Sequence, residues 1–244
     1  MYKSGGIFEY KYFLLVLSVI LLYFLLENQK KAVFSLRKSN KVCMFPQTPI
    51  KTLDFSNVFA RKLPIKLEIC SGHGDWIIEK ASKSLNSANW LALELRFERV
   101  YTIFSKLTFK KLENLIILSG EASYILSNYI EASSLEEIFI NYPDPPVWEY
   151  SQWLLITEKF LRIINNLLIK GKCLTIVTDD KDYAGLMIRE FKKVKDLFKS
   201  KIKDKDFTNE IPKEYGSSYF DRFWTQGNRK TRFFLQYEAL KRKS

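Results

Sequence analysis

The sequence is poor in the residues that most often hold metals or form disulfides. Its 244 residues contain one histidine, His73, and three cysteines. Cys43, Cys70 and Cys173 are too far apart for a zinc knuckle, and their odd number does not indicate a disulfide framework. One histidine also leaves little material for a His-based metal centre or a Ser-His-Asp triad. We therefore expect no metal site.

An acidic excess is also absent. The chain has 39 Lys and Arg against 27 Asp and Glu, a net charge of +12, which favours a polyanionic partner such as RNA, DNA or an anionic membrane. Two clusters of basic residues can neutralise phosphates, one at 192–205 and one made of Arg222, Arg229, Lys230 and Arg232. A solvated basic surface is the alternative for both clusters.

Long hydrophobic runs are limited to residues 12–26, YFLLVLSVILLYFLL, with basic residues on both sides. A membrane-spanning helix needs about 20 apolar residues and a signal-peptide core about 7 to 15, so the length favours a signal sequence. We predict a signal-like apolar segment plus basic leader at 1–50 and a folded domain at 51–244. The leader predicts an organellar location, plastid-like or mitochondrial, with membrane contact during targeting. A membrane anchor formed by residues 12–26 is the alternative.

From residue 64 onward, β-rich runs alternate with amphipathic segments of helical length. The predicted strands are 66–70, 90–95, 114–119, 137–141 and 172–178, and the predicted helices are 75–85, 96–107, 121–131, 152–169 and 181–198. This alternation predicts an α/β fold with a doubly wound, mostly parallel sheet. Residues 217–224 and 230–237 flank the turn-like TQGNR, which predicts a C-terminal antiparallel hairpin.

The first two predicted strands end in groups suited to a nucleotide. Gly72 and Gly74 follow the first strand, where glycines let the backbone approach a ligand, although a tight packing turn is the alternative. Glu94 lies 20 residues beyond Gly74, the spacing at which an acid commonly accepts from ribose hydroxyls. Pairing of Glu94 with Arg96 or Arg99 is the alternative.

The remaining strand ends are also polar. Glu121 follows the third strand, where it can reach an adenine edge or cap a helix. The fourth strand runs into NYPDPP at 141–146, and the prolines make this a rigid loop that fixes Asp144. Thr178 and Asp179 follow the fifth strand, with helix capping as their alternative role.

Five segments in this order, LEICSGHGDW, LALELR, LSGEA, NYPDPP and TDDKDY, resemble the tRNA (guanine-N7)-methyltransferases of the bacterial type. The resemblance covers about residues 64–237. It implies a Rossmann-like class I methyltransferase that uses S-adenosylmethionine to methylate a guanine in the tRNA variable loop. It also implies tRNA as partner, and leaves open a propeller-type partner subunit and whether the protein is a monomer or a homodimer.

The resemblance assigns roles residue by residue. It implies that the cofactor is bound by Glu68, Gly72, Gly74, Glu94, Glu121, Ala122 and Asn141. Asp144 matches the catalytic aspartate, which also contacts the substrate. The remaining residues on the substrate side are Thr178, Asp179 and Ser217, the last in a stretch similar to the family's T-x-x-E.

Three features depart from the family pattern. Cys70 stands where the first glycine of the cofactor loop is expected, and Phe220 stands at the expected Glu position, with Asp221 one residue off. Residues 145–158 contain no Lys or Arg, where the family has a basic cluster. This segment instead carries the aromatic residues Trp148, Tyr150 and Trp153, which can stack on a base or fill a core. The departures keep two alternatives open: a catalytically impaired RNA-binding relative, or a methyltransferase acting on another substrate.

Overall fold

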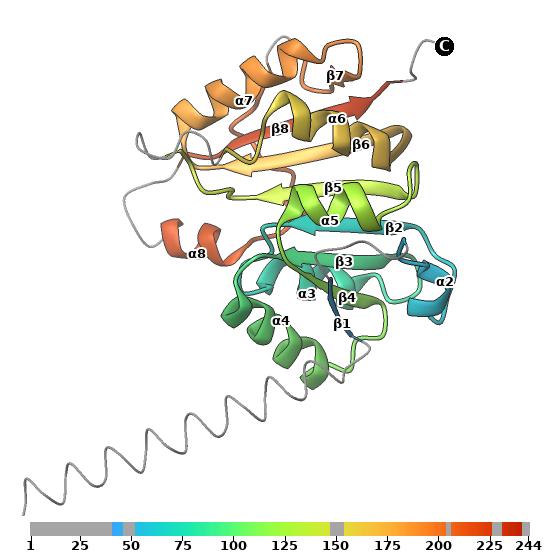
Figure 1. Cartoon of the computed structure of the whole chain (residues 1–244). Helices are drawn as coiled ribbons and strands as arrows, with labels where there is room; N and C mark the ends of the chain where they lie inside the picture. The colour runs from blue at the N-terminus through green and yellow to red at the C-terminus, as the bar shows by residue number, and fades with distance from the viewer. Residues whose placement is uncertain (1–40, 46–51, 147–153, 204–205, 226–230, 241–244) are drawn as a thin grey trace, which may run out of the picture. The chain divides into compact units, whose positions relative to one another are not determined.

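The computed structural model describes residues 41–45, 52–146, 154–203, 206–225 and 231–240. These residues form an eight-stranded sheet with the order β1-β4-β3-β2-β5-β6-β8-β7 (Figure 1). The strands are β1 Val42–Met44, β2 Ile65–Ile69, β3 Asn89–Glu94, β4 Leu115–Ser119, β5 Leu135–Asn141, β6 Leu168–Thr178, β7 Phe198–Ser200 and β8 Phe233–Ala239. Strands β1 to β6 pair in parallel, whereas β8 is antiparallel to both β6 and β7.

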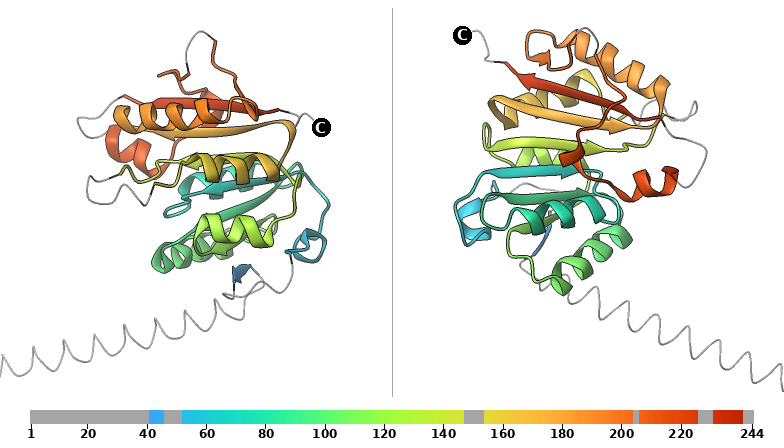
Figure 2. Two further views of the ribbon diagram at one scale, coloured as in Figure 1. Left: turned by 45° about the horizontal axis from the view of Figure 1, so that its top comes forward. Right: turned by 180° about the vertical axis from the view of Figure 1, so that it is seen from behind.

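Helices cover both faces of this sheet. They are α2 Phe55–Val58, α3 Asp75–Lys83, α4 Phe97–Phe109, α5 Ala122–Tyr129, α6 Glu158–Leu167, α7 Lys181–Lys193 and α8 Tyr219–Thr225, with a short 3-10 helix, η2, at Lys213–Tyr215. Helix α3 packs beside α4 on one face, while α5, α6 and α7 pack in series on the other (Figure 2). Because both faces are covered, all six residues of β3 are buried, as expected for a parallel strand.

The predicted alternation of strands and helices is confirmed, with ends that differ by a few residues at most elements. The largest difference is the helix predicted at 152–169, of which 152–153 lie outside the described residues. This helix begins only at Glu158, because Thr157 caps it: the Thr157 hydroxyl accepts from the Phe160 amide at 3.3 Å.

The predicted antiparallel pairing near the C-terminus is also confirmed, but its strands differ from those predicted. Strand β8 pairs with β6 and β7, whereas residues 219–225 form helix α8 and not a strand. The reason is local. The Ser218 amide donates to the Asp221 carboxylate at 2.7 Å, and the Asp221 amide donates to the Ser218 hydroxyl at 3.2 Å. This reciprocal arrangement starts a helix.

Strand β1 extends the sheet into the segment predicted as leader. Val42 pairs with Ile117 of β4, so the sheet includes residues before 51. A three-residue edge strand is too short to give a readable alternation, which is why the sequence did not predict it. Within the described residues, no helix is both long and apolar enough to cross a membrane. The apolar run at 12–26 lies outside those residues, and its role stays a prediction.

Candidate active site

The strand order reverses between β2 and β5, and ligands of open α/β sheets bind at such a point, beyond the carboxyl ends of the strands. Glu68 of β2 and Asn141 of β5 meet across this point, where the Asn141 amide donates to Glu68 Oε1 at 2.7 Å. The Tyr215 hydroxyl in turn donates to Asn141 Oδ1 at 2.6 Å. All three residues are buried, so Asn141 is held between two partners that fix its orientation.

The two glycines after β2 have different tasks. Both have left-handed backbones, with φ of 55° at Gly72 and 79° at Gly74. A Cβ at Gly74 would lie 2.7 Å from Cγ1 of Ile103, so this glycine permits close packing of the loop on α4. A Cβ at Gly72 would meet only the Cys70 carbonyl oxygen, at 4.0 Å, among the described residues. Gly72 therefore offers backbone that a ligand can approach, and the packing alternative holds for Gly74.

Glu94 lies beside the glycine loop at the end of β3. Its carboxylate is buried and accepts from the backbone N–H of Gly72 at 2.8 Å and from that of Arg96 at 2.9 Å. The Arg96 guanidinium pairs instead with Glu98, at 2.5 Å, so the predicted alternative of an Arg96–Glu94 ion pair is wrong. Each Glu94 oxygen keeps a lone pair for the two adjacent hydroxyls of a ribose.

Glu68 has an incomplete set of partners. Within the described part of the chain, its buried Oε2 has no hydrogen-bond partner. Burial raises the pKa of Glu68 to about 8, the charges of Glu94 and Asp75 add to the rise, and the Asn141 hydrogen bond opposes it. A buried acid in this condition favours a proton or a cationic ligand.

The raised pKa of Glu68 predicts a pH-dependent stability. Between the unfolded pKa near 4.5 and the native pKa of about 8, the native protein keeps a proton that the unfolded chain has released. Stability therefore falls as pH rises through this window. Gln does not titrate. The free energy of unfolding of Glu68→Gln, relative to that of the wild type, should therefore rise by on the order of 3 kcal/mol from about pH 5 to about pH 8, as measured by urea unfolding. If the free energies of unfolding of the two proteins changed in parallel with pH, the raised pKa of Glu68 would be contradicted.

Cys70 occupies a backbone conformation that suits glycine, with φ of 62°. Burial raises the pKa of its thiol, and the charges of Glu94, Asp144 and Glu68 raise it further. The thiol is therefore protonated at neutral pH. Carboxylates from β2, β3 and the loop after β5 therefore lie within electrostatic range of this thiol.

The left-handed backbone at Cys70 disfavours replacement by a β-branched residue. Cys70→Gly should leave the free energy of unfolding within about 1 kcal/mol of wild type, because relief of strain offsets the greater freedom of the unfolded chain. Cys70→Val should lower it by about 2 kcal/mol or more, because a β-branched residue fits a left-handed φ poorly. Urea unfolding of both variants measures this, and a Cys70→Val protein as stable as wild type would refute it.

Asp144 lies beyond the end of β5, on the loop predicted to be rigid. The preceding Tyr142 donates its backbone N–H to Val177 at 2.8 Å, so the ladder with β6 continues up to the turn. Pro143 is buried, and Asp144 is exposed. The loop therefore buries one residue and leaves the next open to solvent. Trp148, Tyr150 and Trp153 lie outside the described residues, so their stacking stays a prediction.

The other predicted site residues take local structural contacts. Glu121 is the N-cap of α5 and accepts from the amides of Ser123 and Tyr124, at 2.8 and 2.7 Å, while Ala122 starts the helix. Thr178 accepts from the Asp180 amide at 3.2 Å, and Asp180 caps α7, so neither Thr178 nor Asp179 is the cap. Their ligand contacts stay predictions.

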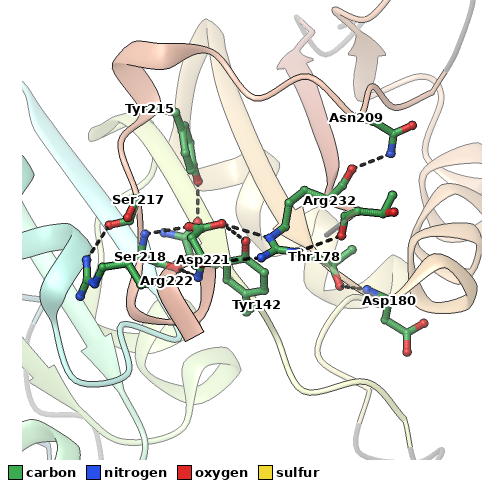
Figure 3. Close-up of polar contacts among 12 residues, drawn as sticks. Tyr142, Thr178, Asp180, Asn209, Tyr215, Ser217, Ser218, Asp221, Arg222 and Arg232 are labelled. Carbon is green, nitrogen blue, oxygen red and sulfur yellow. Dashed lines mark hydrogen bonds and ion pairs between the residues drawn. The ribbon is translucent and has the colours of Figure 1, made fainter. Parts of the chain in front are cut away.

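The C-terminal segment contributes residues that the sequence analysis did not assign to the site. Tyr142, Asp221 and Arg232 meet in a polar cluster (Figure 3). Arg232, predicted to contact phosphate, is buried and paired with Asp221, whereas Arg222 is half-exposed, 3.3 Å from Asp75. The other two members of that basic cluster and the side chain of Phe220 lie outside the described structure. The Ser218-x-x-Asp221 spacing is the signal that could have identified this segment as a helix start.

The reversal of strand order, the antiparallel β8 and the glycine loop with its acidic strand ends define a Rossmann-like class I methyltransferase fold. A solved structure with this fold, titled "Structure of an Antibiotic Related Methyltransferase", superposes with a TM-score of 0.53 at 16% identity. The superposition covers 78% of this chain and 97% of that chain.

Sequence comparison is more specific. The family described as "Putative methyltransferase" matches residues 62–233. The tRNA (guanine-N(7)-)-methyltransferase of Chlamydia muridarum is 35% identical over 70% of this chain and 74% of its own length. The enzyme of the same name from Chlamydia trachomatis gives the same identity and coverage. The chain belongs to the tRNA (guanine-N7)-methyltransferase family.

Proposed function

We propose that this protein transfers the methyl group of S-adenosylmethionine to N7 of a guanine in tRNA. The observation that carries the proposal is the exposed Asp144, on a proline-rich loop within electrostatic range of Cys70 beside the acidic ends of β2 and β3. The named activity of the Chlamydia relatives and the net charge of +12 support the same substrate.

The residues at the carboxyl ends of β2 and β3 fit the cofactor. Glu94 has lone pairs to spare for ribose hydroxyls, and the backbone at Gly72 can be approached closely. Glu68 has an unpaired buried oxygen in an acidic environment, which favours a ligand carrying positive charge. When bound, S-adenosylmethionine supplies an electrophilic methyl group on a sulfonium. Roles for Glu121, Ala122 and Asn141 around it are part of the proposal.

Asp144 acts on the nucleobase in this mechanism. Guanine N7 carries an in-plane lone pair and needs no deprotonation, so the main task is to align N7 with the methyl group. The Asp144 carboxylate accepts from the Watson-Crick donors of guanine, and its charge stabilises the positive ring that forms. Its loop is rigid before the substrate arrives, so little entropy is lost on binding. Thr178, Asp179 and Ser217 complete the substrate side.

Nucleoside mass spectrometry tests the function directly. The full-length protein is incubated with S-adenosylmethionine and unmodified tRNA, because truncation at residue 50 would remove β1. A 7-methylguanosine product is expected. Calorimetry with the cofactor is run in parallel. Cofactor binding and tRNA binding without product would support the catalytically impaired RNA-binding alternative, which is motivated by Cys70, Phe220 and the missing basic cluster at 145–158. Cofactor binding without tRNA binding would favour another substrate.

The remaining predictions concern partners and location. An organellar leader or membrane anchor at residues 1–50, a propeller-type partner subunit and the oligomeric state stay predictions. Fusion of residues 1–50 to a fluorescent protein would test the leader, with organellar fluorescence expected. Diffuse fluorescence throughout the cell would contradict it.

A further inference from the structure

The residue two positions before Asp144 has an unfavourable backbone conformation. Tyr142 has φ of 49°, in the left-handed region that bulky residues rarely adopt. Such a conformation persists only when its surroundings hold it. Tyr142 leads directly into the Pro143-Asp144 turn, so whatever holds Tyr142 also sets the direction in which Asp144 projects.

The Tyr142 side chain is held by the C-terminal segment. Its buried hydroxyl donates to Asp221 Oδ1. Burial raises the pKa of Tyr142, and the Asp221 charge raises it further, so the phenol is neutral and acts as the donor. The Arg232 guanidinium lies over the Tyr142 ring, 5.8 Å from its centroid. Both the ring and the hydroxyl are therefore fixed.

Asp221 and Arg232 are themselves well held. Arg232 Nε donates to Asp221 Oδ1 at 3.2 Å, and the two side chains are only 9% and 17% exposed for Arg232 and Asp221, respectively. The second Asp221 oxygen accepts from the Ser218 amide at 2.7 Å, which ties it to the start of α8. The cluster thus joins the end of β5, the start of α8 and the start of β8 (Figure 3). With both oxygens engaged, the Asp221 carboxylate faces protein groups.

We propose that Asp221 and Arg232 are positioning residues that set the orientation of the Asp144 loop by holding Tyr142 in its left-handed conformation. The inference rests on the proposed function, since it concerns the same site. In this role Asp221 acts on the Asp144 loop through Tyr142 and does not itself bind the substrate. A displacement of about 1 Å in a positioned group can cost about 100-fold in rate, so a loosened Tyr142 should lower kcat.

A double-mutant cycle separates the two roles. Tyr142→Phe removes the hydroxyl and keeps the ring, and Asp221→Asn keeps the shape and removes the charge. Each should lower kcat about 10- to 100-fold with little change in KM for tRNA. If Asp221 acts through Tyr142, the double variant should be no worse than the poorer single variant. Additive losses, or a rise in KM confined to Asp221→Asn, would overturn the proposal. Tyr101→Phe, which removes the hydroxyl of an exposed tyrosine of α4, is the matched control and should be near wild type.

Hydrogen exchange gives a readout that does not depend on methylation. The Tyr142 amide, which donates to the Val177 carbonyl, should exchange faster in Tyr142→Phe and Asp221→Asn than in wild type. Amides of the distant α4 should be unchanged, which separates loosening of the loop from global destabilisation. Unchanged exchange at Tyr142 would overturn the proposal even if wild type methylates tRNA. Faster exchange in the two variants, together with a wild-type protein that makes no 7-methylguanosine, would support the positioning role and show that the proposed function fails.

Discussion

Replacement of Asp144 by Ala or Asn should reduce the rate of tRNA methylation about 100- to 1,000-fold, the usual cost of removing a preorganised polar group that stabilises transition-state charge. The Asn variant tests the charge, because Asn keeps the shape and one acceptor oxygen. The loss should fall mainly on kcat, since the positive charge on guanine forms only as the methyl group moves. Single-turnover formation of 7-methylguanosine at saturating cofactor measures the effect.

Two results would contradict this role for Asp144. Retained methylation in Asp144→Ala would show that the carboxylate does not act on guanine. A loss of cofactor affinity as large as the loss of rate would place Asp144 on the cofactor side instead. Glu131→Gln, which removes the charge of an exposed carboxylate after α5, is the matched control and should behave as wild type.

The sheet and its strand ends were predictable because their signals are local. Alternating apolar runs, paired glycines and a 20-residue spacing between Gly74 and Glu94 are visible in the sequence. Parallel strands bring their carboxyl ends to one edge, so topology alone places Glu68, Glu94 and Asp144 near one another. The structure adds which atoms they contact, such as the Gly72 amide on Glu94.

The C-terminal part of the site was not predictable by the same means. Residues 217–224 are rich in aromatics, a composition that favours strands, and the reciprocal bonds of Ser218 and Asp221 override it. Arg232 lies in a basic stretch that suggested phosphate binding, yet its burial depends on a carboxylate 11 residues away and on the tertiary fold. The left-handed backbones of Cys70 and Tyr142 have no sequence signature, because both are residues that normally avoid that region.

Replacement of Glu94 by Gln should weaken cofactor binding about 10- to 100-fold, because hydrogen bonds to a charged acceptor contribute about 1.5–3 kcal/mol. One Glu94 oxygen accepts from Gly72 and the other from Arg96. A Gln amide can replace only one of these acceptors and turns an N–H donor toward the other backbone N–H. The ribose hydroxyls lose an acceptor at the same time. Isothermal titration calorimetry measures the effect, and Glu98→Gln, whose carboxylate is mostly exposed, is the matched control.

The loss of affinity in Glu94→Gln, compared between two ligands, identifies which interaction of Glu94 is responsible. S-adenosylmethionine and S-adenosylhomocysteine share the ribose, and the first also carries the sulfonium charge. If Glu94 binds the ribose hydroxyls, Glu94→Gln should weaken both ligands by the same factor. If Glu94 acts mainly through its charge, only the sulfonium ligand should lose affinity, as expected for Glu68→Gln. An unchanged affinity for both ligands would restrict Glu94 to holding the Gly72 loop, because its backbone contacts would then account for its burial.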